Sequence, residues 1–140
     1  MFKRFRFAKK LWKANKAATR VSSLLLASSL FPVAVPSGGI DFRLLSDTFA
    51  LGYIYGVIVA CGDQEWDQVE KGLFVQQVFA QLFPGYGQQA TDFCNLHAAQ
   101  DIPPFSEAMR IGFGEAIEMV ASGGQQTMHA LLDHIRRHYV

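Results

Sequence analysis

Apolar residues recur along most of the chain at the three-to-four-residue spacing of α-helices, and the alternation typical of β-strands is nowhere sustained. Glycine and proline interrupt this pattern several times after residue 40. We therefore predict an all-α fold, a single small bundle of about five helices. The predicted helices cover residues 42–61, 65–83, 88–99, a stretch between Pro104 and Gly123, and 127–138.

The first of these helices is apolar on nearly all sides from Phe49 onward, so we expect it at the centre of the bundle. Small side chains recur at every fourth position along it and would let another helix approach closely. They are Thr48, Gly52, Gly56 and Ala60. This stripe predicts either tight packing within the chain or contact with a second chain or a membrane. Arg43 and Asp47 cut the apolar run short, which disfavours a membrane span.

Residues 1–39 follow a different pattern. Residues 1–20 hold eight lysines and arginines and no carboxylate, residues 21–30 are uncharged, and prolines and glycines follow. A basic region, a short apolar run and a small-residue exit are typical of a bacterial secretory signal peptide. We therefore predict that residues 1–39 are a disordered or cleaved leader, with exits after Ser29, Ser37 or Gly39, and that residues 40–140 form the helical domain.

Two other interpretations of this segment stay open. An organelle transit peptide is also basic and free of acid. A membrane-surface arm is the second, because aromatic side chains interleave with the cations and would allow membrane contact through residues 1–31. The apolar run is too short to cross a hydrocarbon layer of roughly 30 Å. The predicted location is therefore periplasmic or secreted, with a membrane-associated or organellar location as the alternative.

Charge separates the two parts of the chain. Residues 1–20 carry +8, whereas residues 41–140 carry −7 from twelve acidic and five basic side chains. An acidic domain is repelled by phosphates, and no nucleic-acid recognition motif accompanies the basic arm. We therefore expect no nucleic-acid partner.

Catalytic motifs are absent from the sequence, so we predict neither an enzyme nor a cofactor. Residues 85–90 spell G-x-G-x-x-A but follow a predicted helix, which indicates a helix–helix turn and not a dinucleotide site. His134 and His138 are one turn apart and are weak metal candidates, because two ligands do not make a zinc site. Among the aromatic residues that could line a ligand pocket are Tyr53 and Tyr55.

Cys61 and Cys94 are the only cysteines. If the chain is exported, we predict a disulfide between them that adds roughly 3–4 kcal/mol of stability in the chain-entropy model. If the chain stays in the cytosol, we expect two buried thiols. His97 lies one turn after Cys94, the spacing of a thiolate–imidazole pair, but no third group is present to orient the ring.

Residues 52–57, Gly-Tyr-Ile-Tyr-Gly-Val, resemble the Gly-Tyr-x-x-Gly-Val stretch in a family of small, exported, helical bacterial immunity proteins. The resemblance implies a small periplasmic helical protein and carries no site residues. The predicted function is therefore that of a non-enzymatic exported helical protein, of immunity or accessory type, that binds a protein partner or a small ligand. The alternative is an accessory protein of the inner membrane surface, anchored by an uncleaved N-terminal arm.

Overall fold

The structure is a computed structural model that describes residues 2–140, with side chains from Arg4 onward. This part of the chain holds six α-helices, and its only β pairing is an isolated bridge between Ala34 and Ile40. The all-α prediction is confirmed, and all five helices predicted after residue 40 are present. The helices are α1 (Phe2–Leu25), α2 (Thr48–Cys61), α3 (Gln68–Leu82), α4 (Gly87–Gln100), α5 (Pro103–Ala121) and α6 (Ala130–His138).

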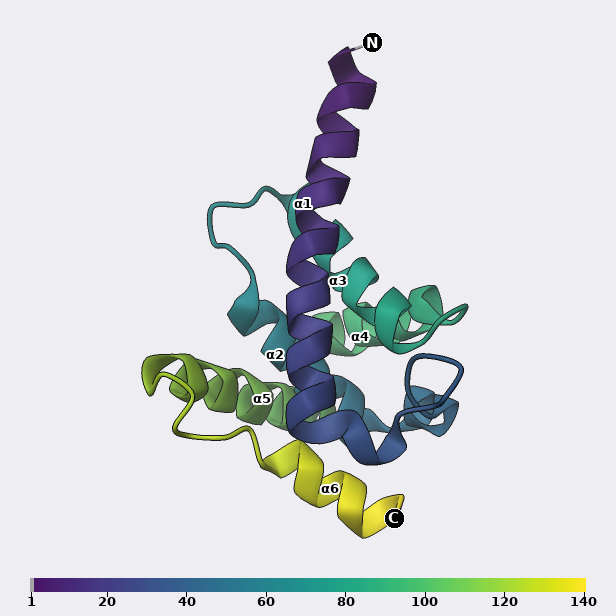
Figure 1. Ribbon diagram of the computed structural model, residues 1–140, viewed down its shortest axis with the longest axis vertical. Helices are drawn as coiled ribbons and strands as arrows, with labels where there is room; N and C mark the ends of the chain where they lie inside the picture. The colour runs from purple at the N-terminus through teal and green to yellow at the C-terminus, as the bar shows by residue number, and fades with distance from the viewer. Residues whose placement is uncertain (1) are drawn as a thin grey trace.

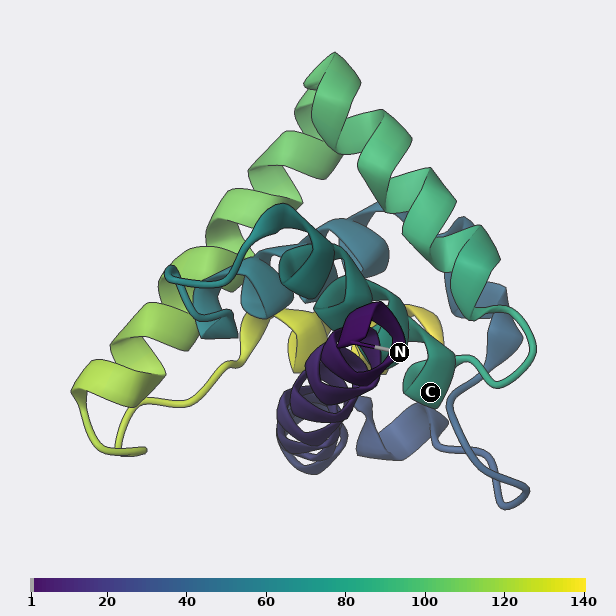
Figure 2. The same ribbon diagram turned by 90° about the horizontal axis from the view of Figure 1, so that it is seen from above.

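Helix α2 contacts each of the other five helices, which confirms its predicted central position. Its contact with α5 is the most extensive in the molecule, followed by the contact between α1 and α3. Figure 1 shows that the first turns of α1 project beyond the rest of the protein. Figure 2 shows α4 and α5 diverging from their connection as the two sides of a V.

Three helices begin later than their patterns predict, because capping groups set their first turns. Helix α2 begins at Thr48 and not at residue 42, since Asp47 caps it and Phe42–Ser46 form a separate 3₁₀ turn. Helix α3 begins at Gln68 and not at residue 65, because Asp67 caps it: its Oδ1 accepts a hydrogen bond from the backbone N–H of Glu70. Helix α6 begins at Ala130 after a loop in which Gly123 and Gly124 have positive φ.

The small-residue stripe of α2 lies against α5 of the same chain. A Cβ atom on Gly52 would stand 2.7 Å from the carbonyl oxygen of Phe105, and one on Gly56 would overlap the carbonyl of Met109. In return, Gly112 of α5 faces the backbone of Tyr53. Backbone meets backbone at this crossing, because any side chain would hold the helices apart. Gly52 and Gly56 are buried beneath α5, so they are not free to join two chains as the dimer interpretation requires.

The N-terminal segment is helical and is part of the core, which differs from the predicted disordered leader. One face of α1 is buried, chiefly against α3. Its residues are Ala14, Ala18, Val21 and Leu25. A π-helical turn over Leu26–Leu30 and a 3₁₀ turn over Phe31–Val33 follow α1 directly. Ser29, at one predicted exit, is fully buried, and its hydroxyl donates to the carbonyl of Met128, 3.2 Å away. Removal of this segment in the cell stays a prediction.

We expect Gly56→Ala to lower the free energy of unfolding by about 1–3 kcal/mol or more, because the added methyl group forces α2 and α5 apart. Gly114→Ala is the matched control, since no atom lies within 4 Å of a Cβ there. That change should be neutral or stabilising by up to about 1 kcal/mol. Urea unfolding followed by circular dichroism measures the free energy of unfolding of both variants. If the two variants are equally stable, the close crossing of α2 and α5 is contradicted.

We also expect Leu25→Ala to destabilise the full-length protein by about 2–5 kcal/mol, because this side chain is fully buried between α1 and the body. Leu96→Ala on α4 is the control, because Leu96 is 54% exposed, and it should change stability by about 0.5 kcal/mol at most. If Leu25→Ala leaves the unfolding midpoint unchanged, α1 is detached from the body in solution.

Candidate functional site

The side of α1 that faces away from the body combines aromatic and cationic side chains. Phe5, Lys9, Trp12 and Lys16 recur at intervals of three or four residues, so they lie on one face of the helix. Phe5 is 72% exposed and Trp12 is 64% exposed, while the ammonium of Lys16 lies 5.3 Å from the Trp12 ring centroid. We call these four residues, with the adjacent Lys13 and Arg20, the outer face of α1. Figure 2 looks along α1 and shows that one side of the helix is not covered by another helix.

Most cations of α1 have no protein counter-charge. Lys10 pairs with Asp67 at 2.7 Å, which joins the first half of α1 to the start of α3. Among the described side chains, the others on α1 have no ion-pair partner: Arg4, Arg6, Lys9, Lys13, Lys16 and Arg20. Six exposed cations on one helix favour an anionic partner outside the chain.

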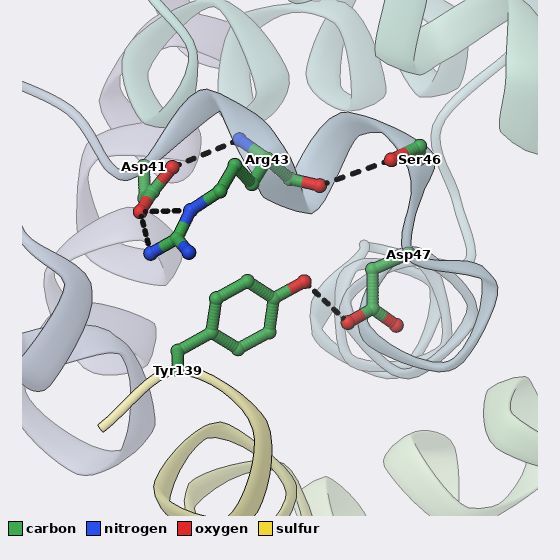
Figure 3. A network of polar contacts seen from close by, with 5 residues as sticks. All are labelled: Asp41, Arg43, Ser46, Asp47 and Tyr139. Carbon is green, nitrogen blue, oxygen red and sulfur yellow. Dashed lines mark hydrogen bonds and ion pairs between the residues drawn. The ribbon is translucent and has the colours of Figure 1, made fainter.

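A second polar group surrounds Asp47 at the start of α2 (Figure 3). Asp47 caps α2 by accepting from the backbone N–H of Ala50 at 3.0 Å. Its other carboxylate oxygen accepts from Nε2–H of His134 and from the hydroxyl of Tyr139, each at 2.7 Å. Arg43 lies over the Tyr139 ring, 5.2 Å from the centroid, and forms an ion pair with Asp41. These contacts attach the C-terminal end of α6 to the start of α2.

The bonds at Asp47 change its acidity. Burial by itself raises the pKa of this carboxyl group, but the hydrogen bonds from Ala50, His134 and Tyr139 outweigh burial and hold the pKa of Asp47 below its ordinary value. The pKa of Tyr139 is raised, first by burial and then by its bond to Asp47. Asp47 is therefore an ionised carboxylate that already accepts three hydrogen bonds, and such a group is a poor general base.

Glu115 of α5 makes a similar attachment at the other end of α6. Its Oε1 accepts from the hydroxyl of Tyr53 at 2.7 Å and from the backbone N–H of Ala130 at 3.1 Å. Its other oxygen lies 3.3 Å from Nδ1 of His129. The carboxylate thus occupies the N-terminus of α6, where negative charge is favoured. Burial, and then the bond to Glu115, raise the pKa of Tyr53, which is a core residue.

The structure brings no metal site together in the part of the chain that it describes. His134 and His138 are adjacent, with ring centroids 4.6 Å apart, but His134 is hydrogen-bonded to Asp47. No local sequence pattern indicates that Asp47 and Tyr139 join His134, because Asp47 is 87 positions from His134 along the chain. His134 is therefore part of a structural contact, whereas His138 is exposed.

The predicted disulfide is not formed, and both cysteines are free. Cys94 is buried on α4 and its thiol contacts the carbonyl of Leu51 at 3.8 Å, whereas Cys61 is half-buried at the end of α2. Burial raises the pKa of both thiols, which disfavours the reactive thiolate. His97 stacks on Phe93, with centroids 3.8 Å apart, and its Nδ1 lies 2.9 Å from the carbonyl of Phe93.

The G-x-G-x-x-A stretch is a helix–helix turn, as predicted. Gly85 has φ +84°, and Gly87 lies against the backbone of Ala80, so α3 and α4 approach closely here. No family model, curated protein or solved structure matches this chain. Within residues 2–140, no helix is both long enough and apolar enough to span a bilayer.

We expect Asp47→Asn to lower stability by about 1–3 kcal/mol at neutral pH, because asparagine keeps the cap but weakens the bonds to His134 and Tyr139. The pKa of Asp47 is depressed in the folded state, so its contribution is present above the ordinary carboxyl pKa and is lost as the pH falls through the folded value. The difference in the free energy of unfolding between Asp47→Asn and the wild type should therefore become smaller below about pH 4.

Urea unfolding at several pH values measures this difference. Asp133→Asn, at an exposed carboxylate on α6, is the control and should change stability by about 0.5 kcal/mol at most. A constant difference between Asp47→Asn and the wild type at every pH would contradict the role assigned to the Asp47 charge.

Proposed function

We propose that this protein is a non-enzymatic accessory protein that attaches to anionic membrane surfaces through the outer face of α1. The observation that carries the proposal is the division of α1 into two faces. One is buried in the core through Ala14, Ala18 and Leu25, and the other presents exposed Phe5 and Trp12 among unpaired cations. Helices that lie in a membrane interface combine such aromatic side chains with lysine and arginine.

Electrostatics favours the same orientation. All twelve acidic residues of the chain lie after residue 40, and the cations of α1 lie before residue 21. The first turns of α1 project beyond the body (Figure 1), so the basic end can approach a negatively charged surface before the acidic body does. Each lysine or arginine near such a surface contributes about 1 kcal/mol.

Packing favours attachment over export of a shortened chain. If residues 1–39 were removed, α3 would lose the helix that covers it, together with the buried side chains Val21, Leu25, Leu30 and Val33. The intact mass of the protein in its native host separates the two hypotheses: a chain beginning at Met1 is expected, and a chain that begins near residue 30 or 40 would favour export.

We expect the full-length protein to bind vesicles of phosphatidylcholine and phosphatidylserine, and to bind pure phosphatidylcholine vesicles weakly. The triple variant Lys9→Gln, Lys13→Gln, Lys16→Gln should bind the anionic vesicles about 100-fold less tightly, because three surface cations are lost. Cosedimentation at low and high salt measures the binding, and high salt should weaken it.

The matched control removes the same charge from elsewhere on the surface: Arg110→Gln, Arg136→Gln, Arg137→Gln. It should bind anionic vesicles nearly as well as the wild type. Equal losses in the two triple variants would show that net charge, and not the outer face of α1, determines binding. Equal binding of the wild type to both kinds of vesicle would refute the proposal.

A further inference from the structure

A cleft of about 420 Å³ opens on the body, away from the outer face of α1 and from the Asp47 group. Its walls come from the C-terminal half of α2, the first half of α3, two residues of α4 and Phe113 of α5. Four helices that are separate in sequence thus meet around it. Its volume lies within the range of about 300–1,000 Å³ that is typical of small-molecule sites.

The floor of the cleft is apolar and aromatic. Ile58 and Phe74 are buried, and Tyr55, at half-burial, contributes its ring. Phe113 lies at the edge and is 42% exposed. These side chains form a surface on which an apolar group the size of one aromatic ring can be buried.

The rim of the cleft is rich in carboxamides. Four exposed amide side chains surround the floor: Gln64, Gln68, Gln76 and Asn95. In the described chain, the glutamine side chains that hydrogen-bond to protein are Gln81 and Gln88, both outside the cleft. The four amides are therefore available to a ligand, and each both donates and accepts hydrogen bonds.

Charge at the rim is balanced. Lys71 and Asp63 are the cation and the carboxylate that line the cleft, so neither sign dominates. A neutral ligand with donors and acceptors of its own matches such a rim better than an ion does, because an ion would lose its hydration without gaining a counter-charge.

Gly72 keeps one wall of the cleft open. It lies inside α3, where glycine costs about 0.5–1 kcal/mol relative to alanine. Apart from its chain neighbours and the backbone of its own helix, no atom lies within 4 Å of the position that its Cβ would take. A larger side chain at Gly72 would therefore extend into the empty volume without displacing the core.

We propose that this cleft binds a small uncharged ligand in which an apolar group, the size of an aromatic ring, is flanked by amide groups. The ring occupies the floor formed by Tyr55, Ile58 and Phe74, and the ligand amides exchange hydrogen bonds with the carboxamides of the rim. This inference does not depend on membrane attachment, because the cleft shares no residue with the outer face of α1.

The test uses the full chain, labelled with ¹⁵N, and N-acetyl-phenylalaninamide as the probe. We expect saturable shifts of the backbone signals of Lys71 and Gly72 and of the side-chain amide of Asn95. Gly72→Leu should weaken binding by at least about tenfold, because leucine fills the volume that the ring needs. Gly114→Leu is the matched control, at a helical glycine with equally open surroundings, and should leave binding unchanged.

Two further probes test the ligand class. N-acetyl-glycinamide lacks the ring and toluene lacks the amides, so neither should give saturable shifts at the concentrations at which the first probe binds. If Gly72→Leu fails to fold, the double variant Gln76→Ala, Asn95→Ala serves instead and should weaken binding. Absence of saturable binding of N-acetyl-phenylalaninamide, equal binding of toluene, or unchanged binding in both cleft variants would overturn the proposal.

Discussion

The backbone contact between α2 and α5 is the constraint on which the rest of the fold depends. Gly52, Gly56 and Gly112 remove the side chains at the crossing, so the two helices meet over an extended length. This pair then positions the two carboxylates that hold α6, because Asp47 caps α2 and Glu115 lies on α5. Both carboxylates are therefore held in structural hydrogen bonds. Asp47 accepts from His134 and Tyr139, and Glu115 accepts from Tyr53.

Helix α1 has a structural role and an exposed surface at the same time. Small side chains such as Ala14 and Ala18 let it lie close to α3, and the Lys10–Asp67 ion pair joins the two helices near their exposed ends. Lys9, Lys13, Lys16 and Arg20 form no ion pair with the acidic body, because they lie on the outer face of α1. The opposite charges of residues 1–20 and 41–140 therefore persist as a charge asymmetry of the folded protein.

Much of the fold could be predicted, because helices of this length carry their own periodic pattern and end at glycine or proline. The central place of residues 49–61 followed from an apolar surface on all sides, and the turn at residues 85–87 followed from Pro84 and Gly85. The first residues of the helices were less predictable, because a helix begins where a carboxylate accepts from its free N–H groups. Asp67 does this at α3, and Glu115, which lies on another helix, does it at α6. The disulfide between Cys61 and Cys94 was predicted from the number of cysteines and from an assumed oxidising compartment. Neither of these determines whether the two side chains lie close together, and both thiols are free.

Neighbouring residues are enough to specify the helical class, the order of the five helices after residue 40, the small-residue stripe and the charge division. The packing of the helices determines that the stripe meets α5, that α1 belongs to the core, and that His134 and Tyr139 share Asp47. Packing also places Gly72 and four carboxamides around one cleft. These are relations between residues far apart in the chain, and they arise from the way helices bury their apolar faces together, which no local pattern specifies.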